Sequence, residues 1–232
     1  MQYYVYFSDA KVEMLASQLQ SDQPTRTETA KQVGVKSVLS FEHKSVREAP
    51  NKYKKLEVIL DWIRANADLG SIDVPGAYIE DEAPINWGIF HIGTSHPMQD
   101  LGDKAPVVFW TETDATRFLM FGSPLHLIGR KTTPEGIGIW SASDAVHYLL
   151  AEVNNDFNLP GEEEFQGAVC RRIWGGSYEE RLRLVFDRVA MAVPSVPSNM
   201  HFVAKRLAAF DRSDRAEKSI VVASPICVAL LE

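Results

Sequence analysis

The chain has 232 residues, of which 45% are hydrophobic and 24% are charged, a composition typical of a folded soluble protein. The formal net charge of -7 and the isoelectric point near 5.4 argue against binding to long nucleic acid or to anionic membranes, because both need a basic surface. No apolar run approaches the roughly 20 residues that a membrane-spanning helix needs.

The two cysteines, Cys170 and Cys227, form no Cys-x-x-Cys pair and sit in apolar surroundings. This pattern is typical of reduced, buried thiols in a cytosolic protein. The N-terminus has neither a basic region nor a cleavable apolar segment, so secretion is not expected. We therefore predict a cytoplasmic protein.

The segment 2–8 is almost entirely apolar or aromatic and predicts a buried strand. Ser8 or Asp9 can cap a following helix, whose apolar stripe begins at Val12. Ligands of open α/β sheets bind where strands hand over to helices, so Ser8, Asp9 and Lys11 are a candidate binding cluster. A helix cap beside a solvated lysine is the alternative interpretation.

A second strand is predicted over Val35–Phe41, and apolar residues at helical spacing predict a helix over about Asn51–Ala67. Alternating strands and helices favour a layered α/β domain. Lys52, Lys54 and Lys55 open the second helix, where the helix macrodipole disfavours cations. One interpretation is that these lysines form a solvated face. The other is that they bind a phosphate or carboxylate, together with the free N–H groups at the start of the helix.

The middle of the chain contains consecutive strand patterns. We predict strands over Ala77–Glu82 and Ile85–His91 around Pro84, then a hairpin of Pro106–Trp110 and Phe118–Phe121 that Leu125–Ile128 continues. Consecutive strands favour antiparallel pairing, so the predicted sheet is mixed.

A shaped loop follows the hairpin, because Gly122 and Gly129 permit unusual backbone angles and flank Ser123 and His126. The two polar side chains can face a common cavity. The loop is neither a Gly-x-Ser-x-Gly nucleophile elbow nor a phosphate-binding P-loop, so a structural or ligand-lining role is favoured over nucleophilic catalysis.

Other candidate ligand groups are less specific. His91 and His96 are close in sequence but lack zinc-site spacing, so no metal site is predicted. Tyr78 and Trp87 lie within predicted strands, where aromatic side chains serve more often as core than as a stacking platform.

The last third of the chain shows helical patterns and then a strand. Helices are predicted over Ala145–Val153, over Tyr178–Ala192, and from a Ser198 cap through residue 210. The closing apolar segment 220–231 predicts a strand, and Pro225 within it indicates an edge or a bulge. A strand at each end of the chain favours a single domain over 1–232.

Several segments together resemble a known family. Tyr3–Leu15 fits the pattern YYVYxSDxKVxML, Pro75–Tyr78 reads PGAY ahead of a Trp-Gly pair, and Gly122–Gly129 fits GSxxHxxG. Over essentially the whole chain these motifs resemble a family of bacterial proteins of unknown function, common in actinobacteria. The resemblance transfers no activity, but it implies an accessory component of bacterial conflict or defence loci.

We therefore expect a single α/β domain, with a mixed sheet flanked by helices, that binds or senses a small anionic, nucleotide-like ligand. Its expected ligand-binding residues are Ser8, Asp9, Lys11, Lys52, Lys55, Tyr78, Trp87, Ser123 and His126. One alternative is a hydrolase or lyase acting on a nucleotide or phosphoester, with Asp9 or His126 as general acid or base. A second alternative is a non-catalytic protein-interaction subunit. The sequence names no cofactor and no oligomeric state.

Overall fold

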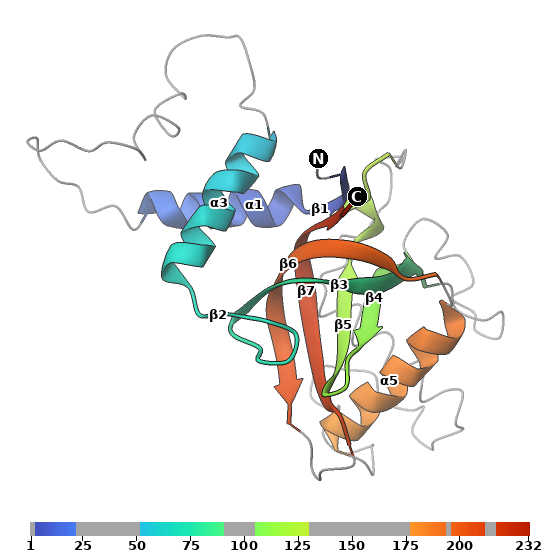
Figure 1. Cartoon of the computed structure of the whole chain (residues 1–232). Coiled ribbons are helices and arrows are strands. Elements are labelled where there is room, and N and C mark those ends of the chain that lie inside the picture. Colours follow the sequence, from blue (N-terminus) through green and yellow to red (C-terminus); the bar gives the residue numbers. More distant parts are fainter. Residues whose placement is uncertain (1–2, 22–51, 91–104, 130–176, 194–195, 212–216) are drawn as a thin grey trace, which may run out of the picture. The chain divides into compact units, whose positions relative to one another are not determined.

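The computed structural model describes residues 3–21, 52–90, 105–129, 177–193, 196–211 and 217–232 (Figure 1). These residues belong to two compact units: a barrel unit of Met1–Ser8 with Ala67–Glu232, and a helical unit of Asp9–Asn66. The strand predicted over 35–41, the helix predicted over 145–153, and His91, His96 and Cys170 all lie outside the described residues.

The helical unit contains α1 (Asp9–Ser21) and α3 (Lys52–Asn66), which confirms both helices predicted there. Apolar residues at helical spacing form its buried side: Val12, Leu15, Ala16, Leu56, Ile59, Leu60 and Ile63. The two helices pack together, and Lys55 Nζ lies 2.8 Å from Glu13 Oε1 across their contact. None of the helices in the described residues is long and apolar enough to cross a membrane.

The barrel unit is built from seven strands in one sheet. They are β1 (Tyr3–Phe7), β2 (Leu69–Gly70), β3 (Tyr78–Ile89), β4 (Val107–Glu112), β5 (Thr116–Gly122), β6 (Ser198–Phe210) and β7 (Ser219–Leu230). Strands β5 and β7 pair in parallel, and β4 pairs antiparallel with β3 and β5, so the predicted mixed sheet is confirmed.

The predicted arrangement of this sheet, as a layer flanked by helices, is wrong because the sheet closes on itself. The ring of strands runs β7-β5-β4-β3-β6 and returns to β7. Closure depends on β3, which pairs with β6 over Tyr78–Ile85 and with β4 over Asn86–Ile89. Sequence patterns identify strands, but they do not show that the first part of a long strand pairs with one strand and its last part with another.

In chain order the ring strands are β3, β4, β5, β6 and β7, and they close in the order first, second, third, fifth, fourth. The third and fifth are parallel, and helix α5 (Tyr178–Ala192) lies between the third and fourth along the chain. This is the strand order of the five-stranded Greek-key barrel known as the OB fold. The remaining strands extend the ring, with β1 beside β7 and β2 beside β3.

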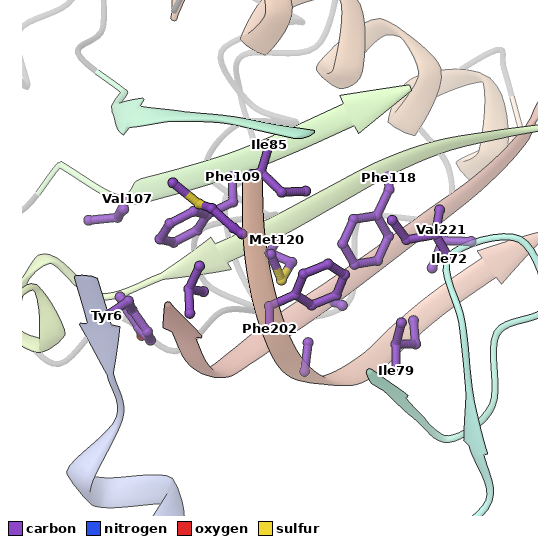
Figure 2. Packing of buried hydrophobic residues seen from close by; sticks show 14 residues of the cluster. Tyr6, Ile72, Ile79, Ile85, Val107, Phe109, Phe118, Met120, Phe202 and Val221 are labelled. Atoms are coloured by element: carbon purple, nitrogen blue, oxygen red, sulfur yellow. The ribbon is translucent and has the colours of Figure 1, made fainter. Parts of the chain in front are cut away.

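The barrel interior is filled by side chains (Figure 2). Alternate residues of each strand point inward, as the period of a strand requires, so Phe118 and Met120 of β5 lie inside together with Phe109 and Phe202. The rings of Phe118 and Phe202 stack at 5.2 Å. Over the described residues, the barrel interior is therefore a packed core.

The opposite face of β4, β5 and β7 is also buried, because α5 packs on it. Its members include Val108, Leu119, Phe121 and Val222, which meet the apolar side of α5. A capping box between Ser177 and Glu180 begins this helix, whose bounds agree with the prediction. Burial on both faces explains why these strands read as nearly continuous apolar runs.

The helix predicted from Ser198 through residue 210 is wrong: this segment is strand β6. Its first half alternates as a strand should, with Met200, Phe202 and Ala204 in the barrel interior. Opposite β7 the register shifts between Arg206 and Ala208, which leaves Leu207 as an extra residue of β6. This bulge interrupts the alternation in the second half of the strand.

Smaller corrections concern the middle strands. The two segments predicted around Pro84 form one strand, β3, and the segment predicted to extend the hairpin holds a 3-10 turn, η3 (Pro124–His126). The hairpin itself is confirmed as β4 and β5. The bulge expected at Pro225 is confirmed by the register shift between its pairing with Ala204 and the preceding pair.

Candidate functional site

The predicted site residues divide between the two units. Ser8, Tyr78, Trp87, Ser123 and His126 belong to the barrel unit, and Asp9, Lys11, Lys52 and Lys55 belong to the helical unit. Each group has its own local chemistry.

In the barrel unit, Ser8 and Ser123 meet at a side chain that the sequence analysis overlooked, Tyr6. Its ring is fully buried at the end of the barrel core, edge-on to Phe109 at 5.7 Å and to His126 at 5.8 Å. Burial raises the pKa of the Tyr6 phenol above its ordinary value, while hydrogen bonds with the Ser123 backbone N–H and the Ser8 hydroxyl act in the opposite direction. The phenol therefore stays neutral.

This Tyr6 cluster explains the local shape of the chain. The Ser8 N–H donates to Ile226 O at 2.9 Å, and the Ile128 N–H donates to Val5 O at 3.0 Å, so strand β7 and the loop after β5 are both fixed to β1. Ser8 and Ser123 are 1% and 6% exposed. The Ser123 hydroxyl accepts a hydrogen bond from the Leu125 N–H within the loop, and the Ser8 hydroxyl forms a hydrogen bond with the Tyr6 phenol. His126 of the same loop is half-buried.

Gly122 makes the Tyr6 cluster possible, because a Cβ added there would lie 2.6 Å from the Tyr6 ring and its hydroxyl oxygen. We expect Gly122→Ala to displace the ring and to lower the free energy of unfolding by about 1–3 kcal/mol, the usual cost of overpacking. Urea unfolding measures this. A tolerated alanine at 122 would contradict the role given to the Tyr6 ring.

The predicted stacking residues lie far apart. Trp87 stacks on Phe109 at 6.0 Å and belongs to the partly buried rim of the core, as the core interpretation expected. Tyr78 begins the same strand, nine residues earlier, which places it about 30 Å away at the usual rise per residue. One small ligand does not reach both rings.

In the helical unit, Lys11 is the most unusual titratable group. Burial lowers the pKa of its amine from 10.5 to about 8. Because the amine is still protonated for the most part at neutral pH, the fold holds a cation in a poorly solvated position. An anion bound beside it would compensate for the lost water.

Lys52 and Lys55 are engaged within the helical unit. Lys55 forms its ion pair with Glu13, and Lys52 Nζ lies 5.4 Å from the centre of the Tyr53 ring. Lys54, in the same turn of α3, is exposed. Lys11 is the predicted cation on which burial acts, by lowering the pKa of its amine.

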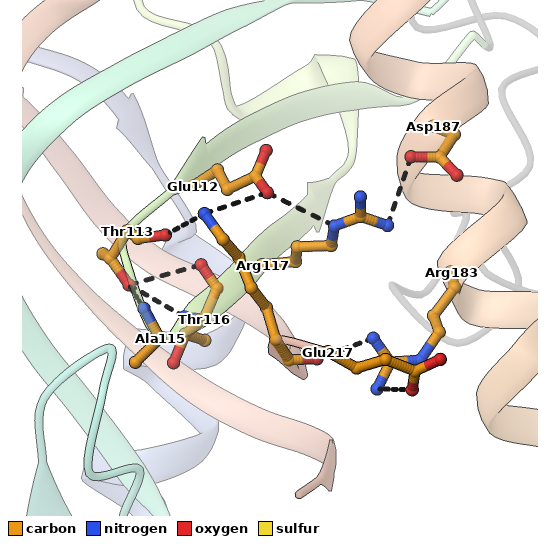
Figure 3. A network of polar contacts seen from close by, with 9 residues as sticks. Glu112, Thr113, Ala115, Thr116, Arg117, Arg183, Asp187 and Glu217 are labelled. Carbon is orange, nitrogen blue, oxygen red and sulfur yellow. Dashed lines mark hydrogen bonds and ion pairs between the residues drawn. The ribbon is translucent and has the colours of Figure 1, made fainter. Parts of the chain in front are cut away.

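A polar network lies where the β4–β5 turn meets α5 (Figure 3). Arg117 bridges Glu112 at 3.4 Å and Asp187 of α5 at 3.2 Å, and Lys218 lies 3.2 Å from Glu112. Arg183 of α5 pairs with Glu179 at 2.7 Å. The cations of this network thus have carboxylate partners, and the arrangement fastens α5 to the barrel instead of presenting charge to a ligand.

Sequence reasoning also missed a histidine–carboxylate pair. His201 Nε2 of β6 lies 2.8 Å from Glu80 Oε1 of β3. Reading residues 198–204 as a strand would have placed Met200 and Phe202 on one face and His201 on the other. A histidine on that face would then have been a candidate site residue. Within the described part of the chain, no group of three or more His, Cys, Asp or Glu side chains is arranged to hold a metal ion.

Comparison with known proteins gives one match. The model of a family of unknown function, DUF7019, matches residues 2–232. Neither the curated proteins nor the solved structures contain a match to the chain.

Proposed function

Since the chain belongs to the DUF7019 family, whose description assigns no activity, its function has to be inferred from its own residues, and we propose that it binds a small anionic ligand at Lys11. A nucleotide or a nucleotide-derived signal is the ligand class. The observation that carries the proposal is the burial of the Lys11 amine, which lowers its pKa to about 8. A bound phosphate would reverse that effect by pairing with the protonated amine.

The barrel unit supports this choice because its interior and the outer face of β4 and β5 are both filled by side chains. Its interior is filled, and OB-type barrels bind oligonucleotides on the outer face of their second and third strands, here β4 and β5. In this chain α5 covers that face, and Leu119 and Phe121 are 0% exposed. A net charge of -7 also opposes binding of long nucleic acid. The accessory role in bacterial defence that the family resemblance implies fits a sensor of such a ligand.

Thermal unfolding against a panel of nucleotides, cyclic and linear oligonucleotides, and inorganic phosphate tests the proposal. A ligand present at 100 times its dissociation constant adds about 2.7 kcal/mol to stability and raises the melting temperature by a few degrees. We expect Lys11→Met to weaken binding about tenfold to a hundredfold, the usual effect of losing a charge-assisted hydrogen bond. Affinity should also fall as the pH rises above about 8, because the amine loses its proton.

Lys54→Met is the matched control, since it removes the same charge from an exposed position of the helical unit. It should leave the dissociation constant within about twofold of the wild-type value. Equal losses in both variants would show that net charge and not the Lys11 site attracts the ligand. A panel without any response would favour the protein-interaction alternative.

A further inference from the structure

Glu80 and His201 lie on the outer face of the barrel, on neighbouring strands. The register of β3 and β6 places Glu80 opposite Val203 and Glu82 opposite His201, so Glu80 and His201 are diagonal neighbours. Their side chains are 18% and 9% exposed, and the contact between Nε2 and Oε1 is 2.8 Å. The carboxylate therefore holds the imidazole in one orientation, mostly away from water.

This contact fixes which ring nitrogen carries the hydrogen. An ionised carboxylate only accepts hydrogen bonds, so in the neutral imidazole Nε2 carries the hydrogen and Nδ1 keeps a lone pair. The Nδ1 atom of His201 is buried, and within the described residues it has no hydrogen-bond partner. A buried acceptor without a donor is unfavourable, and in native proteins such an atom marks strain, a catalytic role, or a bound water or ion.

The face around the ring is acidic on the side of β3, where Glu80 and Glu82 lie, and apolar on the side of β7. On the side of β7, His201 pairs with Ala229 and Val203 pairs with Cys227, and all four residues are buried. In such surroundings a hydrogen bond to Nδ1 is stronger than in water, because no solvent competes for the lone pair.

We propose that His201 Nδ1 is a binding point for a ligand group that donates a hydrogen bond, and that Glu80 is its positioning residue. The ligand class is small molecules with an O–H or N–H group, such as alcohols, phenols and amides. The site at His201 does not depend on the proposed anion site at Lys11.

Nitrogen NMR of protein labelled at histidine tests the proposal with phenol as the donor probe and toluene as its apolar match. We expect the free protein to show the hydrogen of His201 on Nε2. Phenol should then shift the Nδ1 resonance in a saturable manner, and toluene should not. A hydrogen on Nδ1 in the free protein, or equal responses to both probes or to neither, would overturn the proposal.

The variant Glu80→Gln probes the role of the carboxylate. A glutamine amide can donate to Nε2, which moves the ring hydrogen to Nδ1 and turns that atom from acceptor to donor. We expect phenol binding to weaken about tenfold, the usual loss for one neutral hydrogen bond. Glu82→Gln removes the exposed carboxylate opposite His201 and should leave phenol binding unchanged. If both variants bind phenol as the wild type does, Glu80 has no positioning role.

Discussion

Lys11→Met is expected to stabilise the protein at pH 7 by up to about 3 kcal/mol, although the same change removes the proposed ligand contact. The pKa of the amine falls from 10.5 in the unfolded chain to about 8 in the fold, and each pKa unit corresponds to about 1.4 kcal/mol. Below pH 8 both states are protonated, and the wild type bears the full cost of burying the charge. Methionine fills similar space without that cost.

The pH dependence of this difference has a definite sign. Between pH 8 and 10.5 the unfolded wild type binds more protons than the folded form, so the stability of the wild type rises with pH. The advantage of Lys11→Met should therefore shrink over this window and vanish above it. Urea unfolding of both proteins at intervals from pH 7 to 11 measures the difference, in which other titrating groups cancel.

Lys54→Met should show neither effect, because its lysine is exposed. If Lys11→Met were less stable than the wild type at pH 7, the amine would be stabilising the fold and would not be a cation held ready for a ligand. Gain of stability together with loss of binding is the pattern expected of a functional residue.

Phe202→Ala is expected to lower the free energy of unfolding by about 3–5 kcal/mol, the usual cost of removing a buried phenylalanine. Phe202 is 0% exposed, lies in the barrel interior and stacks on Phe118 at 5.2 Å. Truncation leaves a cavity that neighbouring strands of a closed ring cannot easily fill. Urea unfolding again gives the measurement.

Leu207→Ala is the informative comparison, because in the helix predicted for this segment Phe202, Leu207 and Phe210 would be the large apolar side chains. In strand β6 Leu207 is 43% exposed, so its truncation should cost less than about 1 kcal/mol. Large and similar losses in both variants would favour the helix and contradict the barrel register.

The predictions that the structure confirms rest on local, regular patterns. The helix Tyr178–Ala192 has a capping box and four apolar positions at helical spacing, and the β4–β5 hairpin joins two strands across a short turn. Both features lie within about 15 residues of sequence, where propensity and periodicity act directly.

The features that were missed depend on distant pairing. Closure of the barrel requires β3 to pair with β6, and no local pattern in β3 shows where along it one neighbour gives way to the other. Ser8 and Ser123 were identified separately as candidates, but the Tyr6 ring that joins them was interpreted only as part of an apolar strand. His201 was missed because the segment from Ser198 through residue 210 was predicted as a helix and not as strand β6.

The last strand described, β7, pairs with β1, β5 and β6, so three other strands depend on it. Tyr3 meets Leu230, which makes the outermost pairing one of the longest loop closures that the chain can form. During synthesis the ring cannot close until β7 has left the ribosome, and until then three strand edges are unpaired. High contact order predicts slow folding, and the exposed edges predict aggregation of chains that stop before residue 219.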